Sequence, residues 1–147
     1  MPITKDPATI VYLLTTVAIA LHMVLLDAYS GFVRARSRTV VNPEDLGVTG
    51  NGTKLVDQDP PAVARVLRAH RNLLANAIPF ALLGLGWVLT GASLTWALVL
   101  FGTFLVARLI HTLAYVSEKQ PWRTASFVVG QLALVGVVVA LLRNTLA

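Results

Sequence analysis

Long apolar stretches are the feature that most limits what this chain can fold into. The first runs from Ala8 to Leu26 and holds 19 consecutive residues without a formal charge, which is long enough for one helix to cross a bilayer. Only 13% of all residues are charged, against roughly 25% in a typical soluble domain. The sequence predicts an all-α integral membrane protein, a four-helix transmembrane bundle formed by one domain, residues 1–147. The predicted spans are residues 8–26, 62–89, 94–117 and 124–142.

The ends of these spans carry further signals. Pro60 and Pro61 are well placed to open the second helix, because proline fits the first helical turn, and this helix is expected to project beyond the membrane. The connection at residues 90–93 is short, so the second and third helices are predicted to be antiparallel neighbours. Ala18 and Ala20 match a signal-peptide cleavage pattern. The apolar run continues beyond them, so we expect the first span to be retained.

The distribution of basic residues predicts the orientation in the membrane. Four spans place both termini on one side. That side holds two of the 12 Lys and Arg residues, the opposite side holds nine, and Arg108 lies within the third span. Because cytoplasmic loops carry the excess of Lys and Arg, the termini are predicted to lie on the non-cytoplasmic side.

Several kinds of chemistry are excluded or disfavoured by the residues present. Cysteine is absent, which excludes disulfides, thiolate metal sites and iron–sulfur ligation. The His residues form no pair spaced to hold haem across two helices, so no metal site is expected. No Asp or Glu lies within the apolar stretches, which disfavours proton-coupled cation export. The excess of basic residues is attributed to membrane topology, and no nucleic-acid partner is expected.

Polar side chains on three predicted helices gather at one end of the bundle. A polar group within the membrane normally faces the protein interior, and residues three, four or seven positions apart share a helix face. These faces predict an electropositive pocket at the cytoplasmic end, suited to an anionic, hydrogen-bonding molecule. Lipid-soluble partners would enter it from the bilayer. The three faces are Arg68, Asn72 and Asn76; Arg108, His111 and Tyr115; and Arg123, Phe127 and Gln131.

Simpler interpretations exist for most of these residues. The arginines that begin the second helix could anchor lipid headgroups, and Tyr115 could belong to an interfacial belt of aromatic residues. Asn72 and Asn76 could bond to neighbouring helices. Arg108 with His111 is harder to explain in this way, because Arg can extend to the interface from about two turns inside a helix whereas His reaches it poorly.

A set of short motifs runs from the first span to the fourth. The motifs are Val33-Arg34, Asn42-Pro43-Glu44-Asp45, Leu67-Arg68-Ala69-His70-Arg71-Asn72, Pro79-Phe80, Ala107-Arg108, His111-Thr112, Ala114-Tyr115, Pro121, Arg123 and Gln131. In this combination the sequence resembles the MAPEG family, the membrane-associated proteins in eicosanoid and glutathione metabolism, and most closely its prostaglandin E synthase and microsomal glutathione transferase branches.

The resemblance implies a homotrimer with three glutathione sites, each between adjacent subunits near the cytoplasmic face. Glutathione would be the co-substrate, with its charged ends and backbone held by Arg34, Arg71 and Asn72. His111 and Tyr115 would line the site. Together with the polar faces, the predicted ligand-binding residues are Arg34, Arg68, Arg71, Asn72, Arg108, His111, Tyr115 and Gln131.

The resemblance also implies catalytic residues. Arg123 matches the arginine that lies near the thiol, and Thr124 stands where a serine hydroxyl follows it. Asp45 matches an aspartate with a supporting or proton-handling role. The predicted activity is that of a glutathione transferase or peroxidase that acts on lipophilic electrophiles or lipid hydroperoxides. The alternatives are a prostaglandin-endoperoxide isomerase and a non-catalytic, lipid-binding membrane partner.

Three positions depart from the family pattern. Ala75 replaces the glutamate expected three residues after the asparagine, so the carboxylate for the ligand's amino group is missing, and Asn76 or Asp45 would have to replace it. Phe127 replaces a tyrosine and keeps only the ring. The connection from Tyr115 to Arg123 is one residue shorter than in the synthase.

The polar faces also predict assembly. One four-helix subunit has too small an interior to shelter them together with a tripeptide, so we expect the site to be shared across a subunit boundary in a closed oligomer. Gly84, Gly86 and Gly102 are small residues of the kind that let membrane helices approach closely.

Overall fold

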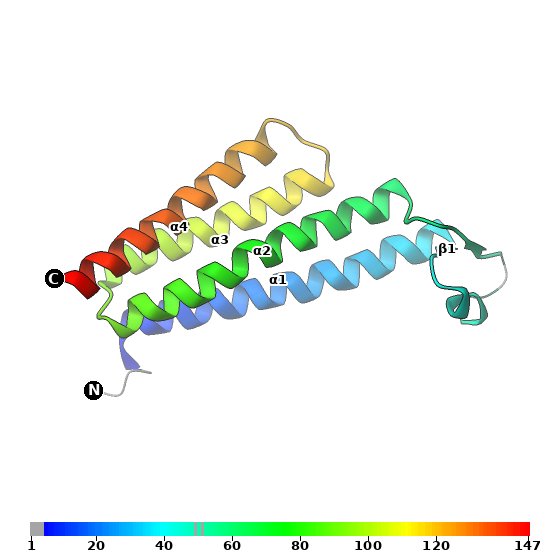
Figure 1. Ribbon diagram of the computed structural model, residues 1–147. Coiled ribbons are helices and arrows are strands. Elements are labelled where there is room, and N and C mark those ends of the chain that lie inside the picture. Colours follow the sequence, from blue (N-terminus) through cyan, green and yellow to red (C-terminus); the bar gives the residue numbers. More distant parts are fainter. Residues whose placement is uncertain (1–4, 49, 51) are drawn as a thin grey trace.

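The structure, a computed structural model, describes residues 5–48, 50 and 52–147. Four α-helices run antiparallel in sequence order (Figure 1). The start of the first helix and the end of the last lie together at what we call the termini end, and the opposite end is called the far end (Figure 1). The first two helices extend beyond the other two at the far end (Figure 1). The helices are α1 (Pro7–Ser37), α2 (Pro61–Leu89), α3 (Leu94–Val116) and α4 (Trp122–Leu146).

Helix α1 is longer than the apolar stretch that predicted it. The Asp6 carboxylate caps its start by accepting a hydrogen bond from the Thr9 backbone N–H at 2.8 Å. The helix continues past Leu26 to Ser37. The next residue, Arg38, caps its end with a left-handed backbone, φ 50°. The residues beyond Leu26 include several arginines, which have good helix propensity. Hydropathy therefore does not indicate where this helix ends.

Aromatic side chains join α1, α2 and α3 in a buried core. The rings of Phe80 and Phe104 stack with their centroids 4.4 Å apart, and Phe101 packs edge-on against Phe80. The Tyr12 hydroxyl donates a hydrogen bond to the backbone carbonyl of Ala81 at 2.8 Å. Aromatic pairs of this kind contribute about 0.5–1.5 kcal/mol beyond their burial, so these contacts fix how the first three helices pack.

Two glycines that were expected to serve subunit assembly pack within this chain. A Cβ added to Gly84 would lie 2.9 Å from the Tyr12 ring, and one added to Gly86 would lie 3.3 Å from Leu141. They allow α2 to approach α1 and α4 of the same subunit. A Cβ added to Gly102 would have nothing within 4 Å in the described part of the chain. Of these three glycines, Gly102 is therefore the one that does not pack against another helix of its own subunit.

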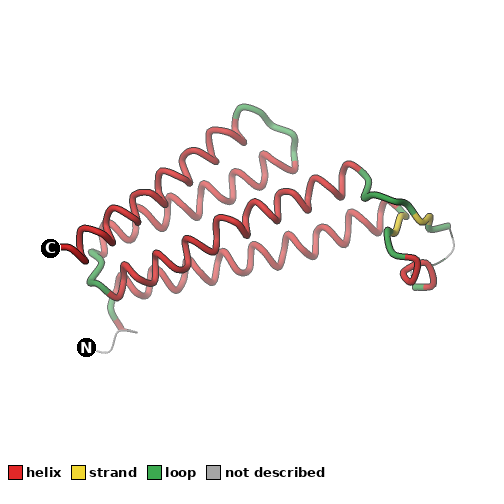
Figure 2. The backbone as a smooth tube through the Cα atoms, in the orientation of Figure 1, coloured by secondary structure: helices red, strands yellow, loops and turns green. Residues whose placement is uncertain are grey.

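The longest of the connections between helices joins α1 to α2 beyond the far end (Figure 1). It contains β1 (Thr39–Val40), the 3₁₀ helix η2 (Pro43–Gly47) and β2 (Lys54–Leu55). The two strands pair in parallel, with Thr39 opposite Lys54 (Figure 2). Because each strand is only two residues long, the fold is still an all-α bundle.

The outward faces of the helices are strongly apolar. All four α-helices are long and apolar enough to cross a membrane. Large aliphatic side chains stand exposed along them, such as Leu14, Leu25, Leu82 and Leu132 at 65–68%. A soluble monomer rarely exposes apolar surface of this extent, whereas lipid solvates it.

Candidate functional site

A cationic pocket of about 250 Å³ lies at the far end, between α2, α3 and α4. Three predicted site residues, Arg68, Tyr115 and Arg123, contribute to its wall. Four cations line it with a single acid, Glu118, which forms an ion pair with Arg65. The pocket is therefore electropositive, as the polar faces predicted. Its lining residues are Arg65, Arg68, Tyr115, Glu118, Lys119, Gln120 and Arg123.

Arg123 is held over an aromatic ring in this pocket. Its guanidinium carbon lies 4.9 Å from the ring centre of Tyr115, a cation–π contact. The position follows from the start of α4, where the Arg123 N–H bonds to the Lys119 carbonyl at 3.1 Å. The Arg123 side chain thus enters the pocket from the first turn of the helix.

His111 links Arg123 to the interior. Its Nδ1 atom lies 3.0 Å from the Arg123 carbonyl, and since a carbonyl only accepts, Nδ1 must carry the proton. In the neutral ring Nε2 is then an acceptor, and this atom is buried with no partner in the described part of the chain. The His111 ring also contacts those of Tyr115 and Phe127, at centroid distances of 5.7 and 5.9 Å.

Arg108 is buried one turn deeper, with an exposed fraction of only 1%. Its Nη2 donates to the Phe127 carbonyl at 3.0 Å. The guanidinium carbon lies 5.4 Å from the ring centre of Phe104 and 5.5 Å from that of Phe127. Nε and Nη1 have no hydrogen-bond partner, and no carboxylate pairs with Arg108 in the described part of the chain. Gly130 makes room for it, because a Cβ there would overlap the guanidinium.

The two asparagines of α2 differ in their side-chain hydrogen bonds. The Asn76 amide nitrogen donates to the Asn72 backbone carbonyl at 2.7 Å, a bond within α2. The Asn72 side-chain oxygen is buried and has no hydrogen-bond partner among the residues that the structure describes. Together with Arg108 and His111, it makes a third helical residue with a buried, unpartnered polar atom in the same half of the bundle.

Arg34 and Asp45 line a separate cavity of about 500 Å³, between the end of α1 and the segment that follows it. Arg34 is already paired there. Its guanidinium donates to the two carboxylate oxygens of Asp59 at 2.8 and 3.0 Å. Within one chain, five of the residues predicted to form one site thus line two separate cavities.

The other six predicted site residues line neither cavity, and three of them, Asn72, Arg108 and His111, are described above. Arg71 is exposed on α2, and Gln131 is half-buried on α4. Thr124 is exposed and donates its hydroxyl hydrogen to the Gln120 side-chain oxygen at 3.2 Å. Ala75 is exposed as well, so this chain leaves room for a longer side chain there.

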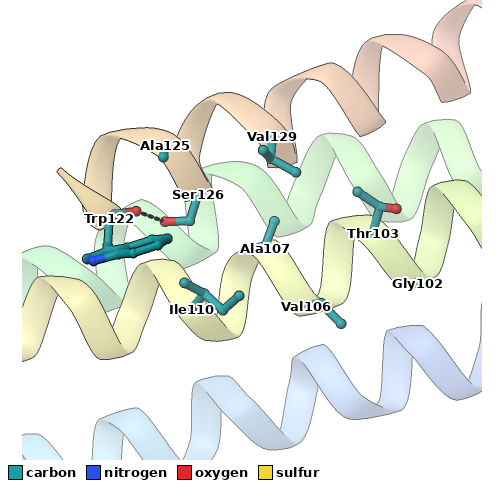
Figure 3. Close-up of a pocket in the computed structure, with 9 residues that line it drawn as sticks. All are labelled: Gly102, Thr103, Val106, Ala107, Ile110, Trp122, Ala125, Ser126 and Val129. Atoms are coloured by element: carbon teal, nitrogen blue, oxygen red, sulfur yellow. Dashed lines mark hydrogen bonds between the residues drawn. The ribbon is translucent and has the colours of Figure 1, made fainter.

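An apolar groove of about 390 Å³ runs between α3 and α4 (Figure 3). The Ser126 hydroxyl turns to the backbone and donates to the Trp122 carbonyl at 2.7 Å, as Figure 3 shows. The groove therefore presents almost entirely hydrocarbon. It is lined by Gly102, Thr103, Val106, Ala107, Ile110, Trp122, Ala125, Ser126 and Val129.

Sequence reasoning missed three residues that shape these sites. Asp59 stands immediately before Pro60, close to the start of α2. An acidic residue at that place could have been predicted to pair with the arginines at the end of α1. Glu118 lies in a short turn and gave no signal. Gly130 was an ordinary small residue in an apolar run, and only the packing of helices shows that it accommodates Arg108.

The fold and these cavities define a class: a multi-pass integral membrane protein with a cationic pocket at one end of a four-helix bundle. The chain belongs to the MAPEG family, whose model matches residues 12–143.

Known relatives cover most of the chain. It is 37% identical to microsomal glutathione S-transferase 1 of Rattus norvegicus over 127 residues, 84% of this chain and 82% of that protein. It is 38% identical to the Mus musculus protein of the same name over 128 residues, with the same coverage. It is 33% identical to prostaglandin E synthase of Homo sapiens over 129 residues, 87% of this chain and 84% of that protein. The family predicted from the motifs is confirmed.

Proposed function

We propose that this protein is a membrane-bound glutathione transferase, for which glutathione is the co-substrate and a lipophilic electrophile the second substrate. The observation that carries the proposal is Arg123, held over Tyr115 in an electropositive pocket. The names of the relatives support glutathione as the thiol. The α3–α4 groove supports a lipophilic second substrate, because it offers hydrocarbon surface on the same two helices that carry His111 and Arg123.

The buried polar atoms fit a peptide that carries carboxylates. Among the described residues, Arg108 has two unpartnered donor nitrogens, Nε and Nη1, and His111 and Asn72 each have an unpartnered acceptor, although none of the three lines the cationic pocket itself. A buried polar group left without a partner costs about 1–3 kcal/mol, so a ligand that supplies both N–H and carbonyl groups is stabilised by satisfying them. Arg68 adds positive charge at the pocket wall.

The ligand's amino group has a weaker partner than the family pattern provides. Neither proposed substitute for the carboxylate missing at Ala75 is available within this pocket: Asn76 is bonded to Asn72, and Asp45 lies in the other cavity. Glu118 is the carboxylate that lines the pocket. We propose that glutathione binds, with its amino end held loosely.

Arg123 is the proposed catalytic residue. A nearby cation favours the ionised form of a thiol, and the thiolate is the nucleophile. In conjugation the thiolate sulfur forms a bond to the electrophilic carbon while the leaving group departs with its bonding electrons. His111 fixes the first turn of α4 through the Arg123 carbonyl and so positions the guanidinium. Thr124 and Asp45 are assigned supporting roles. The same thiolate is proposed to reduce lipid hydroperoxides: its sulfur attacks the terminal peroxide oxygen, the O–O bond breaks, and the alkoxide leaves and takes up a proton to become the alcohol. A second glutathione then attacks the resulting sulfenic acid and gives glutathione disulfide and water.

We further propose a homotrimer with shared sites. Arg34 and Asp45 stand apart from Arg123 in one chain, so a site that uses all three needs groups from two subunits. The excess of basic residues around the far end supports its placement in the cytoplasm, with the termini on the other side.

Titration calorimetry with glutathione in mild detergent tests the binding step. Conjugation of a chloronitrobenzene tests the chemistry, with Arg123→Ala compared against Arg36→Gln, which removes an exposed charge of α1 that lines neither the cationic pocket nor the Arg34–Asp45 cavity. We expect binding in all three proteins and a large loss of turnover only in Arg123→Ala. Equal turnover in both variants would remove Arg123 from the mechanism, and absence of binding at millimolar glutathione would favour a lipid-binding partner without catalysis.

The second candidate activity is isomerisation of a prostaglandin endoperoxide. It is favoured by the 33% identity to prostaglandin E synthases over 129 residues. Phe127 is the ring that contacts both His111 and Arg108 at the site, but it lacks the tyrosine hydroxyl of the synthase pattern. Product analysis with an endoperoxide substrate separates this activity from conjugation.

A further inference from the structure

A further cavity, with both apolar and polar walls, lies at the termini end, far along α3 and α4 from the cationic pocket. It has a volume of about 730 Å³, in the range of small-molecule binding sites. The end of α2, the start of α3 and the last turns of α4 form its walls. We call it the termini-end groove, and none of the predicted glutathione residues lines it.

The chemistry of the groove changes along α4. Leu132, Val135 and Val139 form an apolar wall, and Arg143 and Asn144 stand at its end. The distance from Leu132 to Arg143 along the helix is about 16 Å at a rise of roughly 1.5 Å per residue. This length matches one leaflet, because the hydrocarbon core of a bilayer is about 30 Å thick.

The polar end of the groove is suited to an anion. Arg143 is exposed and forms no ion pair among the described residues, and no acidic side chain lines the groove. Asn144 is tied to the α2–α3 turn by a 3.3 Å hydrogen bond from its amide to the Gly91 carbonyl. Trp96, 58% exposed at this end, adds the amphipathic ring that is enriched at the membrane interface.

The α3–α4 groove in Figure 3 provides a useful contrast. Its only hydroxyls are those of Thr103 and Ser126, and it has no charged group. That groove has nothing to hold a headgroup, whereas the termini-end groove combines an apolar wall of one-leaflet length with a cation at its mouth.

We propose that the termini-end groove binds one membrane phospholipid per subunit, with the phosphate at Arg143 and an acyl chain along Leu132, Val135 and Val139. The site is separate from the glutathione site and does not depend on the proposed enzymatic function. A bound lipid would join the α2–α3 turn to α4 and stabilise the folded protein by mass action.

Native mass spectrometry of delipidated protein, titrated with dioleoylphosphatidylglycerol, tests this proposal. We expect one tightly held lipid per subunit in the wild type. Arg143→Gln should weaken it about fivefold, since one basic residue near the surface contributes about 1 kcal/mol. Val139→Trp should fill the groove and abolish retention. Arg36→Gln removes the same charge at the far end and should leave the lipid in place.

Two further arms identify the occupant. Inorganic phosphate at the same concentration should not displace the lipid, because the acyl chain provides most of the attachment; displacement would mean a simple anion site. Equal lipid retention by the wild type, Arg143→Gln and Val139→Trp would overturn the proposal. So would a change of oligomeric mass in Val139→Trp, because it would show that a second copy of the chain covers the groove.

Discussion

The replacement of Gly130 by Ala tests the packing of Arg108, because it should destabilise the protein where the same change in an open helix stabilises. In an open helix interior this substitution stabilises by about 0.8–1 kcal/mol, because glycine is a poor helix former. At position 130 the new Cβ would overlap the Arg108 guanidinium. Arg108 cannot give way freely, since it lies between the rings of Phe104 and Phe127 and donates to the Phe127 carbonyl. Overpacking of this kind costs about 1–3 kcal/mol, so Gly130→Ala should destabilise by up to about 2 kcal/mol.

The assay is a double-mutant cycle, with unfolding followed by circular dichroism in mixed detergent micelles. In the Arg108→Leu background the shorter side chain leaves room for the methyl group, so Gly130→Ala should now stabilise by about 0.5–1 kcal/mol. The coupling energy between the two positions should therefore reach about 1–3 kcal/mol.

Gly102→Ala is the matched control, because nothing lies within 4 Å of a Cβ at that position of α3. It should stabilise in both backgrounds by a similar amount. If Gly130→Ala behaves like Gly102→Ala in the wild type, or if the cycle shows no coupling, Arg108 does not occupy the place described.

Three other predictions concern glutathione binding, stability and subunit assembly. Ala75→Glu should tighten glutathione by about 10- to 150-fold, the effect of a charge-assisted hydrogen bond of about 1.5–3 kcal/mol; calorimetry showing no gain would mean that another group already holds the amino end. Asp59→Asn should lower the free energy of unfolding by no more than about 1 kcal/mol, because the pair with Arg34 is partly exposed, and a larger loss would indicate that the pair holds α1 against α2. Inactive Arg71→Ala and Arg123→Ala subunits should regain conjugation activity when mixed and reassembled, and no recovery would oppose shared sites.

Much of the fold was predictable because each membrane span is indicated by a continuous apolar stretch of the sequence. The starts of α2 and α3 follow from Pro61 and from the short connection before Leu94, and the apolar runs fix the number of helices. The end of α1 was not predictable from hydropathy. Beyond the membrane the helix no longer has to be apolar, and its charged residues still have good helix propensity.

The candidate site was predictable only in part. Helical spacing brought together Arg108, His111 and Tyr115, and the structure places all three against α4 or the pocket that α4 helps to form. Spacing within a helix says nothing about partners in other segments. The pairing of Arg34 with Asp59 therefore went unnoticed.

The central claim is that Arg123 stabilises a thiolate, and the most direct measurement is the thiol pKa of bound glutathione. Ultraviolet absorbance of the thiolate, followed against pH at saturating glutathione, reports it in wild type and Arg123→Ala. We predict that the pKa in the wild type lies at least about one unit below the ordinary thiol value of about 8.5, a difference of about 1.4 kcal/mol. It should return toward that value in Arg123→Ala, so that conjugation by the variant begins only at higher pH. The same pKa in both proteins would contradict the account.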